Sequence, residues 1–450
     1  MKRRVLATAA QFGLSTILLI YSAIAHCGED AFAKWAAAHA LAVATVDSAA
    51  NDSDLLPLES EIGTAHVVAF GEPMHGAHEP LAFRNRLFRF LVERMGFTAI
   101  ALESGFTESI NARAFIEGGE GDAETALRAG LSNRLSQYRE NRELIQWMRD
   151  YNATASSAGH RKIHLYGIDL TEGARPSGPG VAINSALAFL ARADPTAAQK
   201  IQGSLGASLP GPDAHDFGPL SAAAQAEFET RIRAIAKAMQ ASRKSLIAHS
   251  SAEDYRWALH NLDVARQLAK CLPLTPAGKV NASAWIPAVT CRDYGMAENV
   301  KWARENEGWQ GRLLVFAHDG HVMSWKEDGR RLANVREKPP QMGFHLRRVY
   351  GKDLYIIAMT SATTSGGLLT AKPLEEDSVE SALAGIGLPL MFLDVRRGLQ
   401  NKEALTWLTT RRSMDANVSA QGLVTPATAV DAFFFVNTLT PAIESSDKAR

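Results

Sequence analysis

The sequence has few cysteines and no excess of charge of either sign. Three cysteines in 450 residues cannot build a disulfide framework, and without a C-x-x-C pair the usual zinc knuckle is excluded. The 48 basic and 48 acidic side chains balance, which argues against a protein that holds a polyanion such as DNA or RNA. A hydrophobic fraction of 46% with 21% charged residues excludes a disordered chain or a coiled coil. A packed globular protein remains.

The sequence also lacks the common motifs of catalysis and cofactor binding. It contains no G-x-S-x-G elbow, no H-E-x-x-H helix, no phosphate-binding G-x-x-x-x-G-K loop and no G-x-G-x-x-G fingerprint. These absences argue against a serine nucleophile of the elbow type, a zinc protease helix and nucleotide binding. Hydrolysis by an activated water, without a covalent intermediate, is the reaction that fits best.

One long hydrophobic run is present, at the very start of the chain. Basic residues at 2–4 precede an apolar stretch from Leu14 to Ala25 that ends in Ala-Ile-Ala. This pattern predicts a signal peptide over residues 1–25, cleaved after Ala25, and a periplasmic or secreted protein. A retained membrane anchor is the alternative, but the run is short and interrupted by polar residues. In an oxidising compartment Cys271 and Cys291 can pair, or they can be two separate thiols, because spacing does not decide connectivity.

Short apolar runs alternate with segments whose apolar residues recur at helical spacing. Strands are expected at 65–70, 97–102, 162–168, 313–316, 354–359, 391–393 and 433–436. Helices are expected at 79–95, 106–116, 140–151, 181–193, 222–270 and 292–305. The alternation predicts an α/β fold with a mainly parallel central sheet flanked by helices. We expect a single catalytic domain over residues 26–450, with a helix-rich insertion at about 222–290 as its candidate lid.

Ionisable side chains follow four of the predicted strands. They are Glu72 and His75 after the first, Glu103 after the second, Asp169 after the third, and His318 with His321 after the strand at 313–316. Because the carboxyl ends of parallel strands line one rim of the sheet, we expect these groups to converge. Carboxylates and an imidazole beside buried strands cost desolvation energy unless they pair or take part in chemistry.

These residue types suit proton transfer. A histidine titrates near neutral pH and can take a proton from water, while a neighbouring glutamate fixes its tautomer. Further histidine or arginine donors can stabilise the oxyanion that forms on a carbonyl under attack. A metal centre is the main alternative, because three histidines and two glutamates also make a plausible ligand set. Asp169 also fits a turn cap, and Arg84 on the helix at 79–95 also fits a solvent-facing residue.

Several blocks of the sequence resemble a known family. The run GEPMHGAHEPLAFRNRLFRFLVERMGFTAIALESGF at 71–106 closely resembles the erythromycin esterase family. Further blocks in the family's order are NRELIQWMRDYN at 141–152, HLYGIDL at 164–170, RDYGMAENVKW at 292–302 and VFAHDGHV at 315–322. The resemblance spans roughly residues 55–440. This chain departs from the family with Tyr138, where tryptophan is usual, and Asp319, where asparagine is common.

The resemblance implies an esterase that opens macrolide lactones, an activity of antibiotic resistance. In that reading His75 is the general base on water, and neither metal nor cofactor takes part. Glu72, Arg84, Glu103 and His318 match family positions regarded as functional. His321 matches a second histidine of its motif, and we place it with Asp169 as a candidate substrate contact. The implied partner is a small-molecule ester, with no nucleic acid and no stable membrane anchor after signal cleavage.

Two other functions remain open at the level of sequence. One is a metal-dependent hydrolase, whose activity would be lost on chelation. The other is an exported binding protein that captures a ligand at the strand rim without turnover. Clusters of glutamate and histidine suit proton transfer better than apolar capture, which favours an enzyme.

Overall fold

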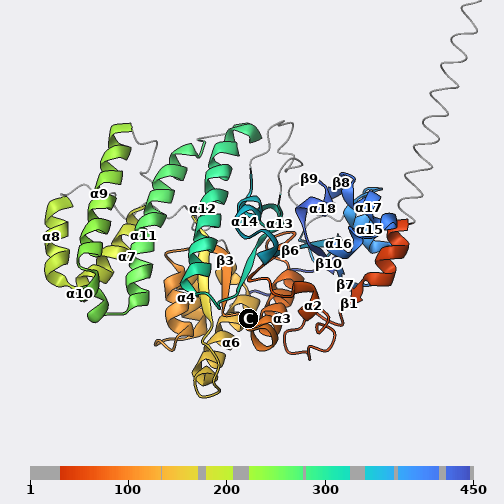
Figure 1. Cartoon of the computed structure of the whole chain (residues 1–450), viewed down its shortest axis with the longest axis horizontal. Coiled ribbons are helices and arrows are strands. Elements are labelled where there is room, and N and C mark those ends of the chain that lie inside the picture. The colour runs from red at the N-terminus through yellow and green to blue at the C-terminus, as the bar shows by residue number, and fades with distance from the viewer. Residues whose placement is uncertain are drawn as a thin grey trace, which may run out of the picture.

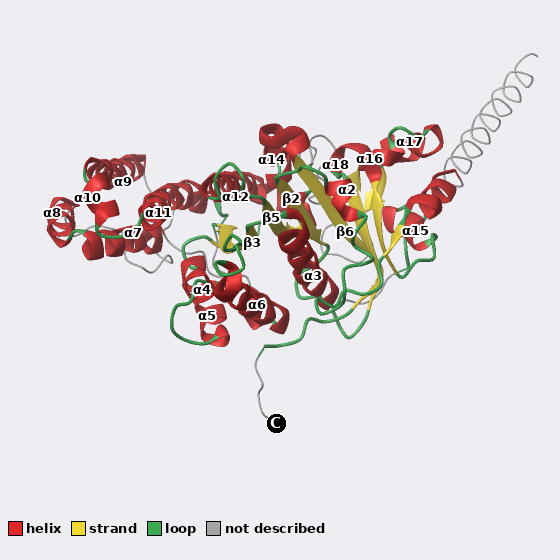
Figure 2. Cartoon of the chain, turned by 60° about the horizontal axis from the view of Figure 1, so that its bottom comes forward, coloured by secondary structure: helices red, strands yellow, loops and turns green. Residues whose placement is uncertain are grey.

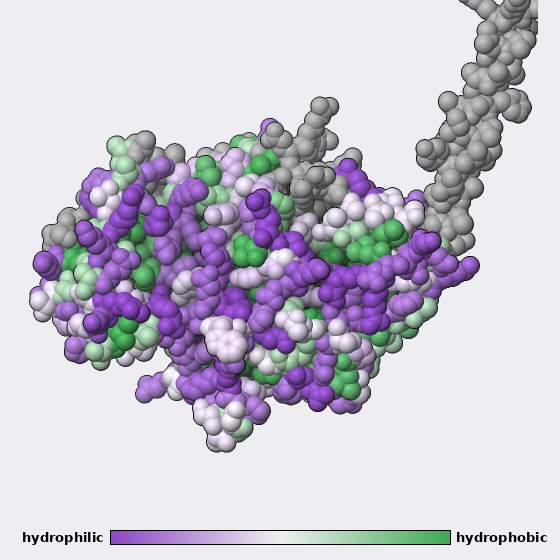
Figure 3. Space-filling model, in the orientation of Figure 1, coloured by the Kyte–Doolittle hydropathy of each residue, from purple (hydrophilic) through white to green (hydrophobic). Residues whose placement is uncertain are grey.

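The computed structural model describes residues 31–132, 134–170, 179–205, 222–276, 280–324, 340–368, 373–414 and 422–445. The predicted signal peptide at 1–25 lies outside these residues. Within them, none of the helices combines the length and the apolar character needed to span a bilayer. The face seen in Figure 3 is mainly hydrophilic, with hydrophobic residues in small scattered patches.

A central eight-stranded sheet organises the fold, in the order β1-β7-β10-β6-β2-β5-β3-β4. The strands are β1 (Leu41–Ala42), β2 (Val67–Glu72), β3 (Ala99–Gly105), β4 (His164–Asp169), β5 (Leu313–His318), β6 (Leu354–Thr364), β7 (Leu390–Asp394) and β10 (Ala432–Leu439). From β10 to β4 every neighbouring pair is parallel, whereas β7 pairs antiparallel with β10 on one side and with β1 on the other. A separate ribbon pairs β8 (Arg412–Met414) with β9 (Gly422–Val424). The predicted α/β fold with a mainly parallel sheet is confirmed.

Both faces of the sheet are covered. Along β2, Val67 and Ala69 contribute to one hydrophobic core, while Val68 and Phe70 contribute to the other. A strand that is buried on both faces has an almost continuous apolar sequence. For this reason apolar and polar residues do not alternate along β2. Figure 2 shows the helices packed against the strands.

The helices divide between the two cores. One core is formed with α2 (Leu58–Ile62), α3 (His78–Met95), α4 (Ser109–Ile116), α5 (Ala123–Gly130) and α6 (Arg139–Ala155). The other is formed with α7 (Pro179–Ala193), α12 (Ile286–Asn306), α14 (Met342–Tyr350), α15 (Val379–Ala384), α17 (Lys402–Thr409) and α18 (Pro426–Ala429). A helix over residues 31–39 precedes β1. Short helical pieces are η1 (Leu135–Gln137), η3 (Leu272–Leu274), η4 (Ala282–Trp285), α13 (Asp319–Val322), η5 (Gly351–Asp353) and α16 (Val395–Gly398).

A helical arm extends beyond the β4 edge of the sheet, on the left of Figure 1. It consists of α7, α8 (Pro195–Leu205), α9 (Ala222–Ala241), α10 (Arg243–Ala248) and α11 (Ala252–Cys271). The helix-rich region is therefore present as predicted, although it begins with α7 rather than at residue 222. A disulfide joins Cys271 at the end of α11 to Cys291 in α12, with the two Cα atoms 5.4 Å apart. The alternative of two separate thiols is thereby excluded.

Candidate active site

The site begins where β2 ends. Glu72, the last residue of β2, is buried, and its position in the sheet is opposite His318 of β5. His75 follows three residues later, with its Nδ1 2.6 Å from Glu72 Oε1. Because a carboxylate only accepts hydrogen bonds, Nδ1 carries the proton and donates it to Glu72. The His75 side chain is 51% exposed, so its Nε2 edge is accessible to a ligand.

Two glycines, one at the end of β2 and one after His75, allow the backbone to take this path. A Cβ on Gly71 would lie 1.9 Å from Asp319 Oδ1, and that carboxylate accepts a hydrogen bond from the Met359 amide at 3.2 Å. Gly76, directly after His75, has a φ of +82°, a conformation that favours glycine. A Cβ on Gly76 would lie 2.9 Å from the hydroxyl oxygen of Tyr138.

Glu103, near the end of β3, is a central acceptor of the site. Its Oε1 accepts from Arg292 Nη2 at 2.8 Å and lies 4.0 Å from His75 Nε2. Its Oε2 accepts from the backbone amide of His318 at 2.8 Å. Burial raises the pKa of this carboxyl, but His321, His75 and Arg292 outweigh burial and hold the pKa well below its usual range. Glu103 is therefore a carboxylate at neutral pH and a weak base.

Arg292 of α12 connects two strand ends. It donates from Nε and Nη2 to the two oxygens of Asp169, at 2.7 and 2.6 Å, and from Nη2 also to Glu103. Burial lowers the pKa of Arg292, but the charges of Asp169 and Glu103 raise it well above its usual value. A forked guanidinium–carboxylate pair of this kind fixes geometry as well as charge.

The two histidines at the end of β5 and in α13 occupy different surroundings. His318 accepts a hydrogen bond from the Gly320 amide at Nδ1, at 3.0 Å, so a neutral ring carries its proton on Nε2. The rings of His318 and His75 have centroids 5.4 Å apart. His321 is buried in α13, with Nδ1 2.7 Å from Asp293 Oδ1.

The protonation of His321 depends on two neighbours of opposite charge, a guanidinium and a carboxylate. Its Nε2 lies 3.0 Å from Arg292 Nη1 and 3.4 Å from Glu103 Oε1. A neutral ring would accept from the guanidinium, whereas an imidazolium donates to the carboxylate. Burial lowers the pKa of His321, but the charges of Asp293 and Glu103 raise it to about 9 despite the opposing charge of Arg292. The imidazolium is thus the favoured form at neutral pH.

His75 has a raised pKa for a similar reason. Burial of the ring edge lowers the pKa, while the charge and hydrogen bond of Glu72 and the charge of Glu103 raise it to about 9. Neutral His75, the form that can take a proton, therefore becomes abundant only as the pH approaches 9.

Arg84 lies behind this cluster instead of facing solvent. Its guanidinium is fully buried, donates to the side-chain oxygens of Asn85 and Asn141, both at 2.7 Å, and lies 4.8 Å from the centroid of the Phe316 ring. Burial lowers the pKa of Arg84 to about 10, and the charge of Glu72 acts in the opposite direction. Arg84 thus provides positive charge on the protein side of Glu72.

The structure brings the predicted residues of the strand ends together at one rim, whereas Arg84 lies behind them on α3. The sequence reasoning missed Arg292 and Asp293, which both lie in a block that the resemblance had marked. A charged pair at the expected start of the helix at 292–305 was a weak signal, because a helix start is also where exposed charges are common.

A cluster with metal-ligand spacing lies elsewhere. Among the described residues, the ligand atoms of Glu117, His164 and Glu253 lie within 4.8 Å of one another. His164 begins β4, at the opposite end of the strand from Asp169. Arg113 donates to both glutamates, so ion pairing with this arginine explains the cluster.

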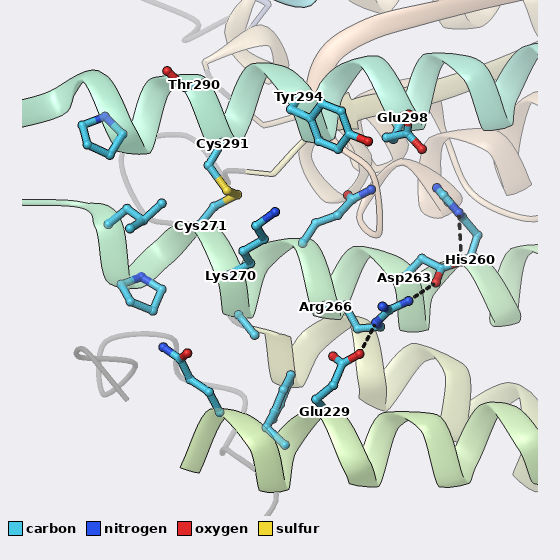
Figure 4. A pocket seen from close by; sticks show the side chains of 18 of the residues that line it. Glu229, His260, Asp263, Arg266, Lys270, Cys271, Thr290, Cys291, Tyr294 and Glu298 are labelled. Atoms are coloured by element: carbon cyan, nitrogen blue, oxygen red, sulfur yellow. Dashed lines mark hydrogen bonds and ion pairs between the residues drawn. A yellow bond between two sulfur atoms is a disulfide. The ribbon is translucent and has the colours of Figure 1, made fainter. Parts of the chain in front are cut away.

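A large cavity is separate from the strand rim. It has a volume of about 1310 Å³ and lies among α9, α11 and α12 (Figure 4). Thr290, Tyr294 and Glu298 line it from α12, whereas Arg292 of the same helix bonds to the strand ends. On its other walls Arg266 of α11 pairs with Glu229 and Asp263 (Figure 4). One face of α12 lines the cavity and another face contacts the strand ends. The helix therefore separates the cavity from the candidate active site.

Comparison with known proteins identifies relatives over most of the chain. The family model described as erythromycin esterase matches residues 92–439. This stretch includes Glu103, Arg292 and His318, while Glu72 and His75 precede it. The erythromycin esterase type II of Escherichia coli is 24% identical over 366 residues, which cover 77% of this chain and 84% of that protein. The putative hydrolase YbfO of Bacillus subtilis is 22% identical over 395 residues, covering 81% and 82%.

Solved structures share the fold. A Bacillus cereus protein superposes with a TM-score of 0.76 at 22% identity and covers 92% of this chain and 98% of its own. A succinoglycan biosynthesis protein gives a TM-score of 0.74 at 20% identity, with the same coverage. A mutant of the erythromycin esterase EreC in its open conformation gives 0.59 at 20% identity, covering 87% and 95%.

Proposed function

The chain belongs to the erythromycin esterase family, and we propose that it hydrolyses a carboxylic ester with a water molecule activated by His75. A macrolide lactone is the first candidate substrate. The observation that carries this proposal is the contact of 2.6 Å between His75 Nδ1 and Glu72, which leaves Nε2 on a half-exposed edge within 4.0 Å of Glu103. An oriented imidazole with one accessible nitrogen is what a general base requires.

The reaction balances with these groups alone. Neutral His75 takes a proton from water at Nε2 as the water oxygen bonds to the carbonyl carbon. The tetrahedral oxyanion then collapses, the bond to the alcohol oxygen breaks, and the His75 imidazolium returns its proton to that oxygen. A lactone is converted into a hydroxy acid. Glu72 holds the Nδ1 proton throughout and stabilises the imidazolium.

The remaining residues have supporting roles in this proposal. Arg292 and the His321 imidazolium supply positive charge for the oxyanion, next to the Glu103 carboxylate. His318, whose ring lies against that of His75, is a further donor to the same oxygen. Asp169 orients Arg292 through two hydrogen bonds, and Arg84 balances the buried charge of Glu72.

We also propose that the protein is exported and works in the periplasm or outside the cell. The amino-terminal pattern at 1–25 motivates this proposal. The disulfide between Cys271 and Cys291 supports it, because such bonds persist mainly in oxidising compartments.

Mass spectrometry of erythromycin incubated with the purified protein tests the proposal. We expect a gain of one water, in the presence and in the absence of EDTA. Activity that disappears with EDTA and returns with a divalent ion would replace the metal-free reaction with a metal-dependent one. A folded protein that leaves erythromycin and a panel of other lactones and acyl esters unchanged would contradict the proposed hydrolase.

A further inference from the structure

The last described segment of the chain, Thr440–Ser445, lies across the loop that carries His75; we call it the C-terminal strap. The His78 amide donates to Thr440 O and the Ala442 amide donates to Gly76 O, both at 2.8 Å. These two bonds flank an antiparallel bridge between Ala77 and Pro441. The strap therefore pairs, like a short strand, with the residues directly after His75.

The same strap is bonded to the segment that starts α6. The Arg139 amide donates to Ile443 O at 2.7 Å, and the Ser445 amide donates to Gln137 O at 2.6 Å. They flank a second antiparallel bridge, between Tyr138 and Glu444. The strap thus joins two segments that are far apart in the sequence.

Two buried glutamates strengthen the connection. Glu79 accepts from the Thr440 amide at 2.8 Å and from its hydroxyl at 2.7 Å. Glu140 Oε1 lies 2.6 Å from His78 Nδ1 and accepts from the Ile443 amide at 3.3 Å. Hydrogen bonds to buried carboxylates are among the stronger ones in proteins, and breaking one leaves a buried charge without a partner.

The loop that carries His75 is also anchored by the burial of Met74 and Ala77, on either side of the histidine. It runs from Glu72 at the end of β2 to His78 at the start of α3, and the half-exposed imidazole is held by its contact with Glu72. Gly76 has a positive φ, and the Tyr138 hydroxyl lies 2.9 Å from the position that a Cβ would take there, so this glycine lies close to the start of α6. The strap bonds to the carbonyl of this same glycine.

We propose that the C-terminal strap is a positioning element for the general base: by clamping Gly76–Glu79 against the start of α6, it holds His75 in register with Glu72. Ala442, through its amide, is the main positioning residue. The inference rests on the proposed function, because it assigns the strap a role in the use of His75 as a base. No part of the strap falls within residues 92–439, the stretch matched by the family model.

Two proline substitutions in the full-length chain test this inference. Ala442→Pro removes the N–H that donates to Gly76, since proline has no amide hydrogen. Glu444→Pro is the matched control, because the Glu444 amide donates no backbone hydrogen bond to the described residues. Ala442→Gly keeps the amide and serves as the conservative variant.

We expect Ala442→Pro to lower kcat by about 10-fold or more with little change in KM, since small displacements of a catalytic group strongly reduce rate. Ala442→Gly restores most of kcat and Glu444→Pro leaves it unchanged. Histidine-selective NMR gives a readout without substrate: in Ala442→Pro the pKa of His75 falls from about 9 toward 6.5, because its contact with Glu72 is loosened. An unchanged titration and an unchanged kcat in Ala442→Pro would overturn the inference.

The two proposals fail in different ways. If the His75 titration moves in Ala442→Pro but no ester is hydrolysed by any variant, the strap positions His75 and the proposed function is wrong. If Ala442→Pro does not fold, hydrogen exchange of the unmodified protein decides the matter. The amides of His78 and Ala442 should then exchange at similar rates, as one unit. Rapid exchange of Ala442 beside a protected His78 would contradict the clamp.

Discussion

At the scale of single residues, the contact between His75 and Glu72 determines both the direction of proton transfer and the pH at which it occurs. A carboxylate at 2.6 Å from Nδ1 fixes the tautomer and favours the imidazolium. The same contact that makes His75 a strong base therefore keeps most of it protonated at neutral pH. Activity at neutral pH depends on the small neutral fraction.

Replacing Glu72 tests this balance. In the unmodified protein kcat/KM should rise with pH until about 9, where His75 loses its proton. In Glu72→Gln the charge that raises the pKa of His75 is gone, so the rising limb should move to lower pH, toward 6.5, while the plateau rate falls. A pH–rate profile of both proteins measures this. A rising limb that stays in place would remove Glu72 from the mechanism.

His321 should make stability depend on pH. Its pKa is about 9 in the folded protein against 6.5 as the ordinary value, so the folded state binds the proton more tightly. The resulting stabilisation is fully present below pH 6.5 and is lost as the pH rises through 9. We expect the free energy of unfolding to decrease over this window by up to about 3 kcal/mol.

Urea unfolding at pH 6.5 and at pH 9 measures the effect, with His321→Asn as the comparison. The substituted side chain does not titrate, so the contribution of His321 should be missing and the decrease should be smaller. An equal decrease in both proteins would show that His321 is neutral, with Arg292 donating to its Nε2.

Site residues that stand at the end of a strand were predictable from the sequence. Glu72, His75, Glu103 and His318 each follow an apolar run, and the end of a parallel strand faces the rim. Arg292 was not predictable in this way, because its contact with Asp169 depends on how α12 lies over the strand ends.

At the scale of elements, the buried strands and the long helices were predictable from their apolar patterns. The start of α12 was not: the helix was expected to begin at residue 292, yet it begins at Ile286 with Pro287 in its first turn. Proline is tolerated there because the first-turn amides have no partner within the helix. The strap after β10 was also missed, since it has no apolar pattern and is held by backbone pairing and by hydrogen bonds to Glu79 and Glu140.

The disulfide should stabilise the helical arm. It joins α11 to α12 across a sequence separation of 20 residues. In the chain-entropy model the bond lowers the conformational entropy of the unfolded chain, which raises the free energy of unfolding by about 3 kcal/mol. Replacing both Cys271 and Cys291 by serine should lower the midpoint of thermal unfolding, and reduction of the unmodified protein should give the same midpoint. If neither treatment changes the midpoint, the bond makes no net contribution to stability.

At the scale of the whole molecule, the strand order creates the site. β5 lies between β2 and β3 in the sheet, although it follows both by about half of the chain. His318 therefore reaches Glu72 and Glu103 at the same time. The sequence predicted that the strand ends converge, but not their order, because the pairing of parallel strands depends on how the connecting helices pack on the two faces of the sheet.

The central claim is that His75 activates water, and the rate of His75→Gln tests it most directly. Glutamine keeps a polar side chain at this position but cannot take the proton. With a substrate that the unmodified protein hydrolyses, we predict a kcat lower by about 10²-fold or more, with circular dichroism and the unfolding midpoint unchanged. A folded His75→Gln variant with a kcat close to that of the unmodified protein would contradict the account.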